Sequence, residues 1–248
     1  MADKEIVRGK ISVVIRARNE EKTIGKTLSL VVSQTIKPDE IVLVDNSSRD
    51  RTIEIAKQFG CRIVNISDTA PYNHATACNL AMEKSKGEYV VFTNGHAFPA
   101  TQQWLESGTR HFTDQKVAGC SGDVYQDERG TFWEIKRQQF LGTLQKPNLK
   151  VHDRISLSGS MNIFHTISGS ARKEAWDQHP FDEQYSEKFH GGEDIDWAFY
   201  LVNKGYAFVS DPGFSVYHSH SENLKTMLQS QKKYMLMYLG AYFRYRPL

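Results

Sequence analysis

Three histidines form the most promising set of side chains for chemistry in this chain. His96 ends the polar triplet Asn94-Gly95-His96, while His218 and His220 flank a single serine much later in the sequence. Imidazole nitrogens bind divalent transition metals, and residues two apart on an extended segment point to the same face. A divalent metal site formed by His96, His218 and His220 is therefore one hypothesis. The alternative is a metal-independent site in which His96 offsets the charge of a bound phosphate directly.

The polar triplet must be carried by a sheet. Apolar segments in the first hundred residues alternate with helical patterns, which predicts right-handed crossovers and parallel strands. The predicted strands are 11–15, 41–44, 61–66 and 88–93. The predicted helices are 19–34 with Asn19 as N-cap, a segment between Asp50 and Gly60, and 73–85.

The second half of the sequence is less regular and predicts a mixed sheet region. We expect helices over 101–113, 193–204 and 223–245, strands over 116–122, 163–171, 207–210 and 214–218, and a helix or ordered insertion over 127–141. The predicted fold class is α/β, with a mostly parallel central sheet, helices on both faces and a mixed C-terminal sheet region.

Polar residues follow three of the predicted strands. They are Arg16–Asn19, Asp45–Ser48 and Asn94–His96, and ligands of open α/β sheets bind beyond the carboxyl ends of the strands. Short polar residues with one carboxylate suit a nucleotide, whose base or ribose would meet the carboxylate while its phosphates meet the polar tips. Neither a Gly-x-Gly-x-x-Gly sequence after the first strand nor a Walker A sequence is present, so dinucleotide and P-loop sites are poorly supported.

Composition excludes several classes of protein. The net charge is only +2 over 248 residues, and lysine and arginine are spread along the chain, which argues against nucleic acid as a partner. Cys61, Cys78 and Cys120 are odd in number and lack a CxxC spacing, so we expect buried thiols in a reducing compartment. No signal-peptide pattern and no run of about 20 apolar residues is present. The predicted location is the cytoplasm.

A series of motifs resembles those of one known family. The motifs are Ser12–Asn19, Ile41–Ser48, Asn73–Asn79, Gly87–Phe92, Ser168–Arg172, Pro180–Glu183, Glu193–Trp197 and Val216–His220. In this order they resemble the family-2 glycosyltransferases, which have the A-type (GT-A) nucleotide-diphospho-sugar transferase fold. The resemblance implies a single catalytic domain over 1–222, with a nucleotide-binding half over 10–100 and an acceptor-binding half over 101–222, followed by an amphipathic helix over 223–248.

The resemblance also implies roles for individual residues. Asp45 would contact the base or ribose of a nucleotide-diphospho-sugar donor. The other implied nucleotide-sugar-binding residues are Ala17, Arg18, Asn19, Glu20, Asn46, Ser47, His74, Asn79, Asn94 and Gly95. The implied acceptor and sugar pocket consists of Ser168, Gly169, Ser170, Glu193 and Trp197.

The resemblance places the metal motif at Asn94-Gly95-His96. His96 stands where the family carries the final aspartate of its DxD motif, so a hard cation would lose its carboxylate ligands. The implied cofactor is a divalent ion, Mn²⁺ or Mg²⁺, with His96, His218 and His220 as candidate ligands.

Asp194 matches the catalytic base of the inverting members of the family. Displacement of a nucleoside diphosphate at an anomeric carbon needs a base on the acceptor hydroxyl, and the preceding Gly191-Gly192 would let a loop carry Asp194 into the site. The alternative is that Glu193, Asp194 and Asp196 merely form an acidic first turn that suits the helix dipole.

The predicted function is therefore that of an inverting, non-processive glycosyltransferase. It would move a sugar to a hydroxyl of a glycan, a glycolipid or a small molecule. Processive synthesis is disfavoured because neither a membrane span nor the Gln-x-x-Arg-Trp motif of processive synthases is present. The alternatives are a non-catalytic nucleotide-sugar-binding protein, favoured by the missing carboxylates at 94–96, and a sugar nucleotidyltransferase, which normally has a Gly-rich opening loop that this chain lacks.

The segment 223–248 has an amphipathic pattern with Met, Tyr and Phe beside lysine and arginine. Such a helix suits the surface of an anionic membrane, which would place the protein at the inner face of the membrane and fit a lipid-linked glycan as acceptor. The alternatives are a helix packed on the domain or one that joins two copies into a homodimer.

Overall fold

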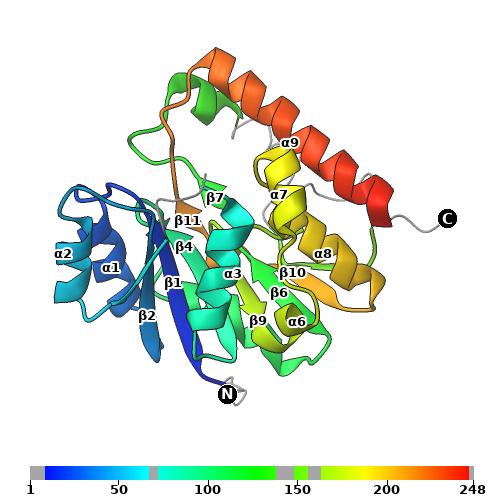
Figure 1. Ribbon diagram of the computed structural model, residues 1–248, viewed down its shortest axis with the longest axis horizontal. Coiled ribbons are helices and arrows are strands. Elements are labelled where there is room, and N and C mark those ends of the chain that lie inside the picture. The colour runs from blue at the N-terminus through cyan, green and yellow to red at the C-terminus, as the bar shows by residue number, and fades with distance from the viewer. Residues whose placement is uncertain (1–8, 67–71, 138–147, 156–162, 246–248) are drawn as a thin grey trace.

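One large sheet organises the protein. The computed structural model describes residues 9–66, 72–137, 148–155 and 163–245. The sheet has the strand order β3-β2-β1-β4-β9-β6-β10-β8 (Figure 1). Its strands are β1 (Ile11–Ala17), β2 (Glu40–Asp45), β3 (Arg62–Asn65), β4 (Tyr89–Asn94), β6 (Val117–Ser121), β8 (Lys150–His152), β9 (Gly169–Arg172) and β10 (Ala207–Ser210). Strands β1 to β4 are parallel, β9 is antiparallel between β4 and β6, and β8 is antiparallel at the edge.

Helices cover both faces of this sheet (Figure 1). The helices are α1 (Ile24–Val32), α2 (Thr52–Gln58), α3 (His74–Lys84), α4 (Trp104–Thr109), α6 (Lys173–Gln178), α7 (Glu183–Phe189), α8 (Glu193–Asn203) and α9 (Leu224–Tyr245), with short 3₁₀ turns η1 (Arg110–Thr113) and η2 (Pro212–Phe214). One hydrophobic core joins the sheet to α1, α2 and α4, and the other joins it to α3 and α6 to α9. The predicted fold class, α/β with a mostly parallel sheet and helices on both faces, is confirmed.

Strand β1 illustrates why the sheet is covered twice. Val13 and Ile15 belong to one core and Val14 to the other, as the alternation of side chains along a strand requires. All three side chains are fully buried, and burial of such a side chain stabilises the fold by about 1.5–3 kcal/mol. The strand therefore reads as a continuous apolar run that ends at the polar Arg16.

A small second sheet brings distant segments together. It has the order β5-β11-β7, with β5 (Phe98–Pro99), β7 (Val124–Tyr125) and β11 (Val216–Tyr217). Strand β11 is antiparallel to β5, with Tyr217 opposite Phe98. His96 lies just before β5 and His218 just after β11, so this pairing brings the two histidines side by side.

Several predicted elements differ in their bounds, and for two of them the local cause is clear. The helix predicted from Asn19 begins only at Ile24, because Asn19 adopts a left-handed conformation (φ 57°) and its Oδ1 accepts a hydrogen bond from the backbone N–H of Arg49 (2.8 Å). The strand predicted over 163–171 is confined to β9, because Ser168 already belongs to a turn held by His165. Residues 132–137 of the insertion predicted over 127–141 are helical, and 138–141 lie outside the described residues.

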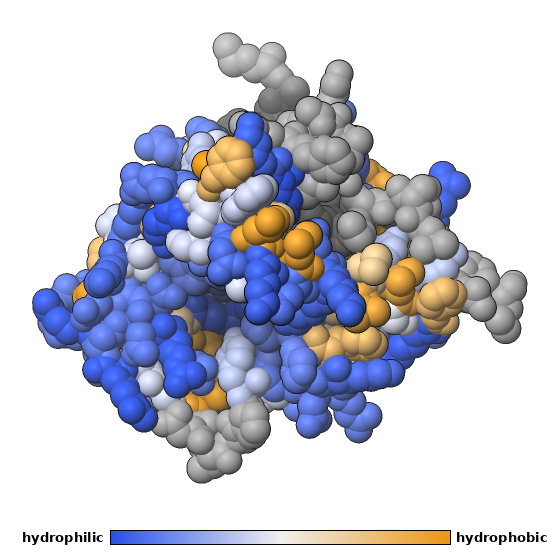
Figure 2. Space-filling view, turned by 90° about the horizontal axis from the view of Figure 1, so that it is seen from above, coloured by the Kyte–Doolittle hydropathy of each residue, from blue (hydrophilic) through white to orange (hydrophobic). Residues whose placement is uncertain are grey.

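Helix α9 crosses the top of the molecule. Its buried residues Met237, Tyr238 and Ala241 pack with α7 and α8. Other apolar side chains of α9 face outward, with Leu228 57% and Met235 49% exposed. Figure 2, which views this upper face, shows apolar side chains exposed among hydrophilic ones. None of the described helices is both long enough and apolar enough to span a bilayer.

Candidate functional site

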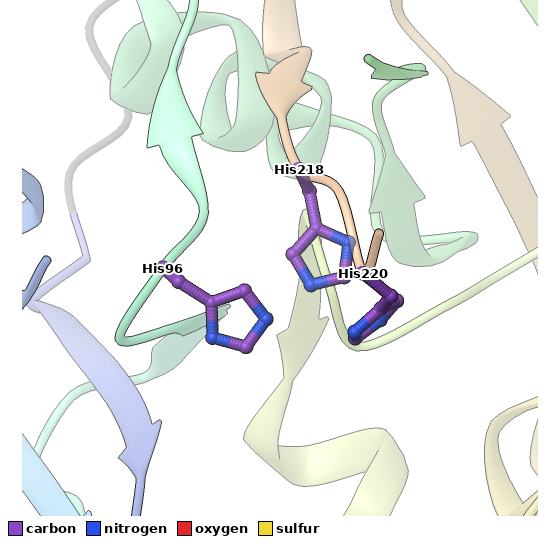
Figure 3. Close-up of side chains that lie close together, drawn as sticks. All are labelled: His96, His218 and His220. Carbon is purple, nitrogen blue, oxygen red and sulfur yellow. The ribbon is translucent and has the colours of Figure 1, made fainter. Parts of the chain in front are cut away.

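The three predicted metal residues lie together. One potential ligand atom from each of His96, His218 and His220 lies within 4.8 Å of the other two. The ring centroids of His96 and His218 are 4.6 Å apart, and those of His218 and His220 are 4.4 Å apart. In Figure 3 the ring of His96 points toward the other two from the turn after β4, while His218 and His220 come from the end of β11. The proximity expected from the sequence is therefore present.

Backbone contacts hold the histidines in place before any ligand arrives. Thr27 Oγ1 in α1 donates to the carbonyl of Gly95 (2.9 Å), and Arg129 donates to the carbonyl of His96 (2.8 Å). On the other side, the N–H of His218 donates to the carbonyl of Tyr125 (2.8 Å). These bonds fix the turn after β4 and the end of β11 relative to each other, which is the preorganisation that a metal site needs.

Glu20 orients the imidazole of His96. Its Oε1 lies 2.6 Å from His96 Nδ1, and its Oε2 accepts from Thr23 Oγ1 (2.7 Å). Burial alone would raise the pKa of Glu20, but the hydrogen bonds from His96 and Thr23 outweigh it and leave the pKa below its ordinary value. Since an ionised carboxylate only accepts, Nδ1 carries the hydrogen, and the lone pair of the neutral imidazole is then on Nε2. The sequence analysis assigned Glu20 to the nucleotide, and the structure instead gives it His96 as partner.

His218 supplies a second free nitrogen. The residue is 3% exposed, and its Nε2 has no hydrogen-bond partner among the described residues. Burial, with the nearby His220 and His96, lowers its pKa to about 2, so the imidazole is neutral at physiological pH. A buried neutral imidazole with an unpartnered nitrogen fits a metal ligand, because the ion would satisfy the atom that the protein leaves unpaired.

Asp194 lies at the start of α8. Gly192, with a left-handed φ of 84°, is the N-cap of this helix. The backbone N–H of Thr166 donates to Asp194 Oδ2 (3.3 Å) and that of Ile195 to Oδ1 (2.9 Å). Burial raises the pKa of Asp194, and the field of His165 opposes this rise only in part. A partly buried carboxylate with a raised pKa is the kind of group that serves as a general base.

Arg16 is a functional candidate that the sequence analysis did not select. Its guanidinium donates to Asn94 Oδ1 (3.1 Å) and to the carbonyl (3.1 Å) and hydroxyl (3.0 Å) of Thr166, while its Nε has no partner among the described residues. It therefore ties the ends of β1 and β4 to the residue that donates to Asp194. The signal in the sequence that could have indicated Arg16 was a charged residue directly after an apolar run.

Asp45 ends β2 beside the end of β1. In the register of the two strands it pairs with Ala17, and the N–H of Asn46 donates to the carbonyl of Ala17 (2.9 Å). Asp45 is 1% exposed, its Oδ2 accepts from the N–H of Ser48 (2.9 Å), and its Oδ1 has no partner among the described residues. Ser47 is left-handed (φ 57°), which turns the chain at this point.

The remaining residues of the predicted donor site differ in their surroundings. Arg18 is exposed, and Asn19 is engaged with the 48–49 turn. His74 begins α3, and burial, followed by the fields of Arg16 and Lys233, lowers its pKa to about 4. Thus the structure brings Ala17, Asp45, Asn46 and Ser47 together at adjacent strand ends, and Asn94 joins them through Arg16.

Asn79 does not fit the nucleotide role predicted for it. Its Oδ1 accepts from Trp176 Nε1 (3.0 Å) and from the N–H of Phe181 (3.0 Å), and its Nδ2 donates to the Phe181 carbonyl (3.0 Å). The amide therefore ties α3 to the segment before α7, and its hydrogen-bonding capacity is used.

The residues predicted to line the acceptor pocket are buried in the structure. Ser168 is fully buried between Trp104 Nε1 (2.9 Å) and the Phe214 carbonyl, and Ser170, with its neighbour Gly169, is buried in β9. Trp197 is buried among aromatic rings of the core. Only Glu193, buried beside Asp194, lies near the candidate base, and burial followed by the charge of Asp194 raises its pKa.

Comparison with known families agrees with this arrangement. Residues 12–174 match the family model described as Glycosyl transferase family 2. The chain belongs to this family. The resemblance drawn from the sequence motifs is thereby confirmed.

Two relatives indicate how the family-2 chain compares with characterised sequences. It is 38% identical over 120 residues to the glycosyltransferase AglE of Haloferax volcanii, a match that covers 46% of this chain and 39% of the relative. It is 24% identical over 216 residues to the O-antigen chain rhamnosyltransferase RfbN of Salmonella typhimurium, covering 86% of this chain and 67% of the relative. The matched part of AglE is thus well under half of that protein.

Solved structures share the fold. The mannosyltransferase PcManGT of Pyrobaculum calidifontis, solved with GDP-Man and Mn²⁺, has a TM-score of 0.70 at 17% identity, covering 96% of this chain and 65% of that one. The glucosyl-3-phosphoglycerate synthase of Mycobacterium tuberculosis, solved with Mn²⁺, UDP-Glc and phosphoglyceric acid, has a TM-score of 0.64 at 16% identity, covering 94% and 80%. At these identities the likeness concerns the fold.

Proposed function

We propose that this family-2 chain is an inverting, non-processive glycosyltransferase that moves a sugar from a nucleotide-diphospho-sugar to a hydroxyl acceptor, with Asp194 as the general base. The supporting observation is the chain of hydrogen bonds from Asp194 through Thr166 and Arg16 to Asn94. It links a carboxylate with a raised pKa to the strand ends at which ligands of α/β sheets bind. A carboxylate oxygen of Asp194 would take the proton of the acceptor hydroxyl while the hydroxyl oxygen attacks the anomeric carbon of the donor sugar. The nucleoside diphosphate would leave from the opposite face of that carbon.

The donor would lie across the ends of β1 and β2. The unpartnered Oδ1 of the buried Asp45 would accept a hydrogen bond from the base or ribose. Solved relatives of the fold carry GDP-Man and UDP-Glc, which supports the class of donor but leaves the base and the sugar open. No comparable observation favours a sugar nucleotidyltransferase or a non-catalytic binding protein.

The three histidines would hold a divalent ion. When bound, it would supply positive charge to the diphosphate, whose negative charge grows as it leaves. The neutral imidazole of His218, with its unpartnered Nε2, fits such an ion. The protein's own residues contribute the orientation: Glu20 fixes the His96 ring, and Thr27 fixes the turn that carries it.

Replacement of Asp45 with asparagine tests the donor site. We expect nucleoside diphosphate to bind about 10- to 100-fold more weakly, because a hydrogen bond to a charged group contributes about 1.5–3 kcal/mol. Thermal shift with GDP, UDP and dTDP, with and without Mn²⁺, measures this, since a ligand that binds the native state raises its melting temperature. Asp39→Asn is the control, because Asp39 lies before β2 at the opposite edge of the sheet. Equal shifts in the two variants would remove Asp45 from the donor site.

We further propose that the outward face of α9 contacts an anionic membrane and thereby meets a lipid-linked glycan acceptor. This helix contains no aspartate or glutamate, carries Lys225, Lys232 and Lys233, and exposes Leu228 and Met235. A helix of this kind binds the membrane interface through apolar burial and attraction to anionic lipid.

The double variant Leu228→Gln/Met235→Gln tests the membrane contact. We expect wild type to co-sediment with phosphatidylglycerol vesicles and the variant to do so several-fold less, because two exposed apolar side chains are lost. These substitutions spare the core, whereas deletion of α9 would strip away the buried Met237 and Tyr238. Absence of wild-type binding would exclude the membrane, and a concentration-dependent dimer in light scattering would favour the homodimer.

A further inference from the structure

The histidine cluster contains nitrogen donors and no carboxylate within bonding reach of a shared ion. Among the described residues, the group able to hold a metal consists of His96, His218 and His220 alone. Mg²⁺ demands oxygen ligands in an octahedron, whereas imidazole suits the later transition metals such as Zn²⁺, and the affinity of a nitrogen site rises from Mn²⁺ to Co²⁺. The histidine cluster should therefore prefer different metal ions from a site whose ligands are carboxylates.

The cluster is close to a bonding geometry. A transition-metal ion holds imidazole nitrogens at about 2.1 Å, which sets them roughly 3.4 Å apart in a tetrahedral site. The three ligand atoms lie within 4.8 Å of one another, so small rotations of the rings bring them to that spacing. Two nitrogens already have free lone pairs, His96 Nε2 by its tautomer and His218 Nε2 by its lack of a partner.

Glu20 reaches His96 only because residue 95 is glycine. A Cβ added at Gly95 would lie 2.8 Å from Glu20 Cγ, closer than real contacts allow, and 3.0 Å from Glu20 Cβ, which is tighter than most real contacts. The same carboxylate is held by Thr23. The sequence Asn94-Gly95-His96 thus provides both a ligand and the space for its outer-shell carboxylate, the arrangement that orients metal-bound histidines in proteins.

The charges around the cluster also suit a cation. Glu20 contacts His96, Glu134 accepts from the N–H of His220 (3.1 Å), and Asp127 pairs with Arg129. Three carboxylates therefore face one guanidinium at the edge of the cluster. The excess of negative charge offsets the repulsion between Arg129 and a bound ion.

We propose, on the basis of the function proposed above, that Glu20 is the positioning residue of a three-imidazole site, and that this site binds transition-metal ions such as Co²⁺, Zn²⁺ and Mn²⁺ in preference to Mg²⁺. Glu20 donates no ligand atom itself. It holds the N–H tautomer of His96 so that Nε2 faces the ion with His218 and His220.

Titration of tag-free, metal-stripped protein with each metal alone tests this inference. Isothermal calorimetry gives the affinities, and the visible d–d absorption of Co²⁺ reports the ligand geometry. We expect Co²⁺ and Zn²⁺ to bind on the order of a hundredfold or more tighter than Mg²⁺. The affinity for Mn²⁺ should lie between that for Mg²⁺ and that for Co²⁺. Glu20→Ala should weaken Co²⁺ binding about 10- to 100-fold and alter its spectrum. Glu20→Gln, whose amide oxygen still accepts from Nδ1, should recover part of the loss.

Glu21→Ala is the matched control, because Glu21 is the exposed neighbour whose carboxylate accepts from the Arg51 N–H (3.2 Å) away from the cluster. His96→Ala should abolish the Co²⁺ spectrum. Equal affinity for Mg²⁺ and Co²⁺, or the same affinity in Glu20→Ala and Glu21→Ala, would overturn the inference. These titrations contain neither a nucleotide-sugar donor nor a hydroxyl acceptor. A failure of sugar transfer would therefore leave the metal affinities unaffected, so the two proposals can be disproved separately.

Discussion

Asp194→Asn is expected to reduce kcat about 10²- to 10⁴-fold, the range of general-base catalysis, while leaving the affinity for nucleoside diphosphate unchanged. Asparagine has nearly the same shape, and its single amide oxygen can still accept one of the two backbone hydrogen bonds, from the N–H of Thr166 or of Ile195, so we expect α8 to keep its start. What is lost is the ability to take the proton of the acceptor hydroxyl. Steady-state kinetics of sugar transfer and calorimetric titration with nucleoside diphosphate measure the two quantities.

The matched control is Asp196→Asn in the same first turn. The carboxylate of Asp196 accepts from Arg244 (3.0 Å) and from the Tyr245 hydroxyl (3.2 Å), so it ties α8 to α9. We expect this variant to lose stability and to keep its turnover. If Asp194 served only as an acidic first-turn residue, its replacement would cost about 0.3–1 kcal/mol of stability and would leave transfer intact. That result would remove Asp194 as the base.

Asp194 also sets a pH dependence for transfer. Burial raises the pKa of its carboxyl above the ordinary value of 3.8. A base acts only when deprotonated, so kcat/KM should fall as the pH falls through this raised pKa. The acid limb of the wild-type profile should therefore lie at a higher pH than an exposed aspartate would give.

Those parts of the site that follow from strand ends could be predicted from the sequence. An apolar strand that stops at polar residues indicates where a ligand binds, and this placed Asp45 and Asn94 at the correct edge of the sheet. His96, His218 and His220 were selected together by residue type. The strand pairing that unites them, between two-residue strands β5 and β11, left no periodic pattern in the sequence.

Side-chain partners far apart in the sequence could not be predicted. Asn79 and Trp176 are joined across 97 positions, and Trp104 and Ser168 across 64. A buried serine and an accessible serine have the same signature in a single sequence, so Ser168 and Ser170 were assigned to a pocket and lie in the core. Glu20 was assigned to the nucleotide by the family resemblance, and its pairing with His96 across the space at Gly95 leaves no pattern in the sequence.

Arg16→Met is expected to lower kcat/KM about a hundredfold and to move the acid limb of its pH profile to higher pH. Arg16 is a buried cation whose hydrogen bonds hold Thr166 and Asn94, and a displacement of about 1 Å in a catalytic group can cost this much. Burial raises the pKa of Asp194, and the positive charge of Arg16 is one of the influences that oppose this rise, because an opposite charge favours the ionised carboxylate. Without that charge Asp194 stays protonated to a higher pH.

Two further variants separate charge from geometry. Arg16→Lys keeps the cation but cannot reproduce the paired hydrogen bonds, so we expect a lower kcat/KM with an unshifted acid limb. Arg18→Met is the control for a loss of charge on the same segment, because Arg18 is exposed. The other titratable groups whose fields couple to Asp194 are His165, Glu193, Cys78, Tyr185 and Tyr234. All of them are unchanged in these variants, so a shift seen in Arg16→Met alone belongs to the guanidinium. Identical pH profiles in Arg16→Met and Arg18→Met would mean that Arg16 serves the fold and not the base.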